Sequence, residues 1–160
     1  MLFRSVQHKD LTAIQPIFDS LIASYLDDVE KYARNDTQVL HLRHVIRSSF
    51  AEAGKRIKFA GFGNSAYRSR EMGECLRTLE KVLLLHLLYP NTSATLPFQP
   101  DLKKSPRLQI LDTGMLNHFV GIQKEILGTN DLSKIYQGTM IEHLTGQELL
   151  ANQYHALNEL

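Results

Sequence analysis

Apolar side chains recur at alternating steps of three and four residues near the start of the chain, and this spacing is typical of an amphipathic helix. They are Leu11, Ile14, Phe18, Leu21, Tyr25, Val29 and Tyr32. Pro16 is tolerated only in the first turn of a helix, so we expect the regular part of this helix to run from about Gln15 to Arg34. This part of the chain is therefore predicted to be helical rather than extended.

The remaining pattern predicts a fold that is mainly α with a few short strands. Asn35-Asp36 predicts the end of the first helix followed by the N-cap of a second helix, which is expected to end at Ala53-Gly54. Further helices are expected at 69–80, 115–121 and 136–154, and extended pieces at 56–59, 82–89 and 107–111. The proline-containing stretch 91–106 is expected to be a loop or wing.

Composition narrows the class of protein. Of 160 residues, 43% are apolar and 22% are charged, which provides for a packed core in one domain or two small ones and excludes collagen-like and wholly disordered chains. A single cysteine, Cys75, forms no internal disulfide and no Cys/His zinc pattern, so a reducing, cytoplasmic location is expected. The longest apolar run, Val82–Leu88, is far shorter than the roughly 20 residues of a membrane span.

Charge is distributed unevenly along the chain, although the formal net charge is only +1. Residues 1–40 hold four basic and six acidic side chains, residues 41–110 hold twelve and five, and residues 111–160 hold two and six. A basic middle therefore lies between two acidic ends. Such a distribution bears on partners and association rather than on the fold.

The basic middle points to nucleic acid. The candidate binding residues are Lys55, Lys58, Arg68, Arg70, Arg77 and Lys81. Arg70, Glu74 and Arg77 share one helical stripe that could neutralise phosphates, but it could equally be a surface of Arg–Glu pairs. The order of helix, extended piece, basic helix, strand and loop is that of a winged helix-turn-helix, which presents its second helix to double-stranded DNA.

Other chemistry finds little support in the sequence. Gly54-Lys55 lacks the rest of a Walker phosphate-binding motif, and no GxSxG nucleophile motif occurs. His41 and His44 share a helical face without further metal ligands, so we expect a solvated or DNA-facing pair. The carboxylates of Asp27, Asp28 and Glu30 precede Lys31 and Arg34 at pairing distance and are expected to form an exposed charged face.

Two longer motifs carry a family resemblance. Residues 104–116 are similar to a K-S-P-[KR]-L-x-x-x-D-T-G-[LM]-L signature, and residues 138–149 to a G-x-x-x-E-x-x-x-x-x-E-L helix. Residues 24–33, 54–59, 69–72 and 76–81 add to the likeness. Together they resemble a prokaryotic family of AAA-type ATPases with a C-terminal domain of unknown function. The motif residues singled out are Lys104, Pro106, Asp112, Gly114, Gly138, Glu142 and Glu148.

The resemblance implies three parts. Residues 1–35 would be a linker helix after an ATPase core, residues 36–103 a winged-helix module, and residues 104–160 the opening of a fold like the PD-(D/E)XK nucleases. ATP and Mg²⁺ would bind to the core, which this sequence lacks, and the chain itself would hold no cofactor or metal. Glu142 would correspond to the first acidic residue of the nuclease-like fold, without its partners.

Three functions follow as hypotheses. The first is a non-catalytic fragment of an AAA-type ATP-binding protein that contributes binding of double-stranded DNA. The second is a module for self-association or for binding another protein. The third is residual ATPase or nuclease activity, which the missing Walker motifs and the missing carboxylate partners of Glu142 disfavour.

Overall fold

The computed structural model describes residues 11–91, 99–121 and 138–158. Within them the chain is mainly helical, with one small antiparallel sheet, as the sequence predicts. None of the helices in the described ranges has the length and apolar character needed to cross a membrane.

The first helix, α2 (Leu11–Asp28), differs from its prediction at both ends. It contains Pro16 in its sixth position, so the expectation that the helix begins near Gln15 was wrong. The proline removes one backbone donor, but Phe18 on the same helix is buried in the core and holds this segment in place. At the other end, α2 stops at Asp28 rather than Arg34, because a 3₁₀ turn, η1 (Val29–Lys31), buries Val29.

The second helix, α3 (Asp36–Ala51), begins where the sequence predicts. The Asn35 side chain accepts a hydrogen bond from the Gln38 backbone N–H at 2.9 Å. The Gln38 side chain in turn accepts one from the Arg34 backbone N–H at 2.8 Å. The first bond satisfies a donor that the helix itself leaves unpaired, so the N-cap predicted within Asn35-Asp36 is confirmed at Asn35.

Residues 52–68, which include a turn at Gly63, join α3 to the third helix, α4 (Ser69–Lys81). The turn contains the 3₁₀ segment η2 (Phe62–Asn64), in which Gly63 has φ +64°. A Cβ at Gly63 would meet the Ser48 side chain and would come within 2.9 Å of His44 Nε2. Glycine is therefore required at this position both by the backbone and by the close approach of α3.

The buried face of α4 consists of Met72, Gly73, Cys75, Leu76 and Leu79, and it packs on α3 and on the first strand. Strand β1 (Leu85–Leu88) pairs with β2 (Arg107–Ile110) in an antiparallel sheet, with Leu85 opposite Ile110 and Leu88 opposite Arg107. Residues 54–57 add a further edge to β2: the backbone N–H groups of Gly54 and Ile57 donate to the Leu108 and Pro106 carbonyls at 2.8 and 2.9 Å. The extended piece expected at 56–59 thus pairs with β2 at its beginning.

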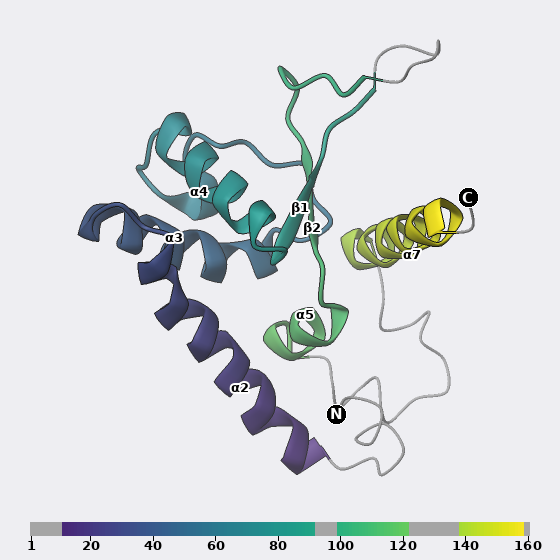
Figure 1. Ribbon diagram of the computed structural model, residues 1–160, viewed down its shortest axis with the longest axis horizontal. Coiled ribbons are helices and arrows are strands. Elements are labelled where there is room, and N and C mark those ends of the chain that lie inside the picture. Colours follow the sequence, from purple (N-terminus) through teal and green to yellow (C-terminus); the bar gives the residue numbers. More distant parts are fainter. Residues whose placement is uncertain (1–10, 92–98, 122–137, 159–160) are drawn as a thin grey trace.

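The last elements are α5 (Thr113–Phe119) and α7 (Thr139–Asn158). Figure 1 shows the β1–β2 hairpin between α4 and α7, and α5 beside α2. Helix α7 continues to Asn158, beyond its predicted end at 154, and its predicted start at 136 lies outside the described residues.

One core joins these elements. Buried apolar side chains from α2, α3, α4, β1, β2 and α5 form a continuous cluster. The boundary expected between residues 103 and 104 falls between β1 and β2, which pair with each other. Residues on both sides of that boundary therefore contribute to one sheet and one core.

Candidate nucleic-acid interface

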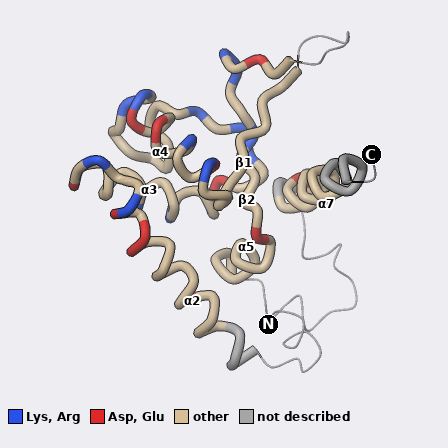
Figure 2. The backbone as a smooth tube through the Cα atoms, in the orientation of Figure 1, with Lys and Arg blue, Asp and Glu red and all other residues tan. Residues whose placement is uncertain are grey.

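The outer face of α4 carries the predicted basic stripe. Arg70, Arg77 and Lys81 are exposed, on the side opposite the buried Met72, Leu76 and Leu79. Figure 2 shows basic residues gathered on α4 and on the segment that precedes it. Because 13 residues of α-helix span about 20 Å, this stripe is long enough to follow several successive phosphates.

The six predicted contact residues divide into two groups. Lys55 and Arg70 already face carboxylates: Lys55 Nζ lies 3.5 Å from Glu52 Oε1, and Arg70 Nε lies 3.4 Å from Glu74 Oε1. The others, Lys58, Arg68, Arg77 and Lys81, form no ion pair within the described ranges. Part of the stripe is therefore the surface of Arg–Glu pairs that the sequence left open, and part is free for another anion.

Arg77 lies over an aromatic ring, that of Phe59. Its guanidinium carbon lies 6.0 Å from the centre of the Phe59 ring, at the outer limit of a cation–π contact. Gly73, one turn earlier on α4, lets this ring approach, because a Cβ there would lie 3.0 Å from Phe59 Cδ2. The Phe59 ring thus gives Arg77 a flat apolar support while leaving its donors exposed.

A groove of about 320 Å³ lies beside the N-terminus of α4. Its charged lining residues are Lys58, Lys103 and Lys104, and Ser69 and Ser105 add hydroxyl groups. None of the lining residues carries a carboxylate. All three lysines are exposed, so the groove is a concave surface of positive charge.

Sequence reasoning found only part of this groove. Lys58 was predicted as a binding residue and Lys104 only as a motif residue, whereas Lys103 was missed. The fold brings them together because Ile57, next to Lys58, pairs with Pro106 at the edge of β2. A run of two lysines before a strand is the one local signal that pointed to this site.

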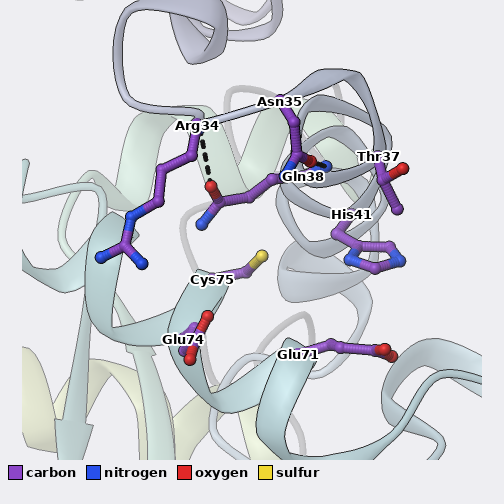
Figure 3. Close-up of a pocket in the computed structure, with 8 residues that line it drawn as sticks. All are labelled: Arg34, Asn35, Thr37, Gln38, His41, Glu71, Glu74 and Cys75. Atoms are coloured by element: carbon purple, nitrogen blue, oxygen red, sulfur yellow. Dashed lines mark hydrogen bonds between the residues drawn. The ribbon is translucent and has the colours of Figure 1, made fainter.

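A second pocket, of about 370 Å³, lies between α3 and α4, and Figure 3 shows its lining side chains. It contains the Arg34 guanidinium, but also Glu71 and Glu74 and the buried Cys75. Burial, with smaller contributions from the two glutamates, raises the pKa of the Cys75 thiol to about 11. The thiol is therefore protonated at neutral pH and is a poor nucleophile or metal ligand here.

The histidine pair does not face solvent as expected. His41 is 9% exposed and packs edge-on against Tyr67, with ring centres 4.3 Å apart. His44 Nε2 lies 2.9 Å from the Phe62 carbonyl oxygen. The expectation of a solvated or DNA-facing pair was wrong for His41, because a turn 26 residues further along covers it. Within the described ranges no group of His, Cys, Asp and Glu could hold a metal ion.

The acidic cluster at the end of α2 lies at the surface, as predicted, and two of its three carboxylates, those of Asp28 and Glu30, form ion pairs in the described ranges. Lys31 Nζ lies 2.6 Å from Asp28 Oδ1, and this hydrogen bond raises the pKa of Lys31. Glu30 pairs with Arg43 at 3.2 Å rather than with Arg34. These contacts leave the cluster with a structural role on the surface.

The other motif residues have structural positions in the described fold. Asp112 caps α5, its Oδ1 accepting from the Met115 N–H at 2.9 Å, and Gly114 lets Phe18 of α2 approach, since a Cβ there would lie 3.0 Å from Phe18 Cζ. Pro106 is buried at the edge of β2, Gly138 has φ +58° just before α7, and Glu148 is exposed. Glu142 forms an ion pair with Arg107.

A protein-family model described as "Domain of unknown function (DUF8612)" matches residues 4–126. The chain belongs to this family. No curated protein and no solved structure matches it. The DUF8612 region contains the sheet, α2 to α5, the groove and all six predicted contact residues, whereas α7 lies outside it.

Proposed function

We propose that this chain binds double-stranded DNA through the groove of Lys58, Lys103 and Lys104 and the adjoining face of α4. The groove carries the proposal, because three unpaired lysines converge on a concavity without any carboxylate. Phosphate groups of a nucleic-acid backbone are the natural ligand of such a surface. The N-terminal dipole of α4 adds to the same positive potential.

The order of elements supports the same proposal. Helix α3, the paired segment 54–57, helix α4 and the β1–β2 hairpin follow each other as in a winged helix-turn-helix. In that arrangement α4 would be the helix presented to the major groove, which is about 12 Å wide and admits one helix. The turn of Lys103 and Lys104, at the base of the loop between the strands, would then contact the flanking backbone.

We further propose that this DNA-binding part belongs to an AAA-type ATP-binding protein of the cytoplasm. The signature at residues 104–116 and the helix motif at residues 138–149 support this relationship. ATP and Mg²⁺ would bind to the ATPase core, and the chain described here would be non-catalytic. Nuclease-like activity at Glu142 is disfavoured, because its carboxylate pairs with Arg107.

Two variants of equal charge change test DNA binding. K103A/K104A removes two lysines of the groove, and K31A/R34A removes two exposed basic residues that do not line it. Fluorescence anisotropy with a labelled 30-base-pair duplex would give the dissociation constant at several salt concentrations. K103A/K104A should lose two phosphate contacts, so the slope of log K against log salt should become less steep by about 2. An equal slope for both variants would contradict the proposal.

Self-association is the second candidate, and α2 favours it. Ile17 and Leu21 lie one turn apart on α2 and are 41% and 39% exposed, which is unusual for large apolar side chains on one helical face. If α2 forms a dimer contact, light scattering should give twice the monomer mass, and I17E/L21E should restore the monomer. A monomeric wild-type protein at all concentrations tested would exclude this candidate.

A further inference from the structure

Helix α7 lies on the side of the hairpin away from α4, outside the DUF8612 region. Because successive side chains of a strand point to opposite faces, Arg107 and Gln109 of β2 project to the side that α7 covers, whereas Leu108 and Ile110 enter the core. The main contacts of α7 are with β2. This helix therefore covers the polar face of the sheet.

The Arg107 side chain is held in a defined position on this face. One terminal nitrogen of its guanidinium donates to the Gly54 carbonyl oxygen at 2.8 Å, and the same nitrogen contacts the Glu142 carboxylate of α7. Its side chain is 35% exposed and that of Glu142 is 54% exposed. The guanidinium thus faces solvent in part, and a carboxylate is the one anion that it meets within the described ranges.

Arg107 lies close in the chain to the basic groove, although it lines the cleft beside α7. It follows Pro106, which lines the groove, and it lies opposite Arg56 in the bridge between β2 and the segment before α4. Arg56 is exposed and has no ion pair in the described part of the chain. Arg56 and Arg107 thus place two basic side chains beside each other, next in the chain to residues that line the groove or precede it.

In the described ranges, several buried polar atoms lack hydrogen-bond partners where α7 docks on the hairpin. His143 is fully buried, and neither ring nitrogen has a hydrogen-bond partner in the described structure. The same holds for both polar atoms of the Gln109 side chain, which is pressed against Gly146 of α7. Burying polar groups without partners opposes docking, because water would satisfy them once α7 leaves.

Apolar contacts offset this cost only in part. Ile141 and Leu149 of α7 remain 47% and 64% exposed, and a cleft of about 360 Å³ runs between α7 and the hairpin. Apart from Met140, which packs against the core, α7 is held by the Gln147 side chain, which donates to the Ile110 carbonyl oxygen, and by the ion pair of Glu142 with Arg107. A competing anion at Arg107 would remove that ion pair.

We propose that Arg107 is a second phosphate-binding position for the DNA backbone, and that the Glu142 carboxylate of α7 takes the place of the phosphate when no DNA is bound. This inference rests on the proposed DNA binding and adds its regulation. Docking of α7 and engagement of DNA by Arg107 compete, because each brings a negative group to the same guanidinium. Engagement of Arg107 by DNA therefore weakens the attachment of α7 to the hairpin.

The test compares E142Q with E148Q. Both variants remove one negative charge from α7, but Glu148 is exposed and forms no ion pair in the described ranges. E142Q removes the ion pair of Arg107. The slope of its plot of log K against log salt should therefore be steeper than that of wild type by about 0.9, the value for one phosphate contact. Its advantage over wild type should then be about 3.5-fold larger at 50 mM than at 200 mM salt. E148Q should keep the wild-type slope.

A second measurement follows α7 directly. Hydrogen exchange of the wild-type protein should show that α7 amides lose protection when the 30-base-pair duplex is added. Equal slopes for E142Q and E148Q, or an α7 that stays protected in the complex, would overturn the role of Arg107. In that case a weakened K103A/K104A would leave the groove proposal intact, whereas binding by none of these proteins would overturn both proposals.

Discussion

Acidification should release α7 from the hairpin through His143. Burial of this side chain lowers its pKa from 6.5 to about 4. The imidazole is therefore neutral when α7 is docked at pH 5, but it binds a proton readily once α7 has opened. Because the open state takes up more protons between pH 4 and 6.5, the docked state loses stability as the pH falls through that range.

The magnitude follows from the two pKa values. Between pH 7 and pH 5, an imidazole with a pKa of 6.5 when open and about 4 when docked disfavours docking by about 2 kcal/mol. This corresponds to a change of roughly 25-fold in the equilibrium between docked and open α7. The loss of stability of the docked state is nearly absent above pH 7 and reaches its limit below pH 4.

The assay is hydrogen exchange of the α7 amides, corrected for the intrinsic exchange rate at each pH. The control is H143L, which has no proton to bind and also removes two unpartnered ring nitrogens from the interior. At pH 7 we expect H143L to be more protected than wild type by about 1 kcal/mol, since a buried polar group is lost. On going to pH 5, the opening free energy of wild type should fall by about 2 kcal/mol more than that of H143L. If the opening free energy of the two proteins depended equally on pH, His143 would not be the group that releases α7.

Three further outcomes are expected in the body of the fold. D112A should lower the free energy of unfolding in urea by about 1 kcal/mol, because Asp112 caps α5 through the Met115 N–H; an unchanged value would contradict this role. Iodoacetamide should not label Cys75 in the folded protein at pH 8, where the buried thiol with a pKa of about 11 stays protonated, but should label it in urea. G63A should lower the melting temperature measured by circular dichroism, by an amount equivalent to more than about 1 kcal/mol, because Gly63 has φ +64° and faces the Ser48 side chain; a tolerated alanine would show that the turn adapts.

The sequence predicted the elements whose signals are local. The start of α3 follows from Asn35 and its hydrogen bond to Gln38, two side chains three residues apart. The buried face of α4 and the cap of α5 at Asp112 are likewise readable from a few neighbouring residues. Such features depend on helix period and on backbone donors within one turn, and both are encoded in short windows.

Features that depend on distant segments could not be read in this way. The burial of His41 depends on Tyr67, and the edge formed by Gly54 and Ile57 depends on a strand about 50 residues later. The start of α2 was predicted wrongly for a related reason. The prediction considered only the local cost of Pro16 in a helix, whereas Phe18 on the same helix is buried in a core built from many segments. Tertiary packing decided all three.

The same distinction sharpens the choice between a DNA-binding surface and a surface of ion pairs. Sequence spacing treats Arg70 and Lys58 alike, but Arg70 pairs with Glu74, whereas Lys58 lines a groove whose other charged residues are lysines. A cation that already has a carboxylate partner gains less from a phosphate, since one ion pair is exchanged for another. Affinity and its salt dependence should therefore come from the groove more than from the stripe. Arg107 lies between these cases: its partner carboxylate is on α7, a helix that leaves polar groups unpartnered where it docks.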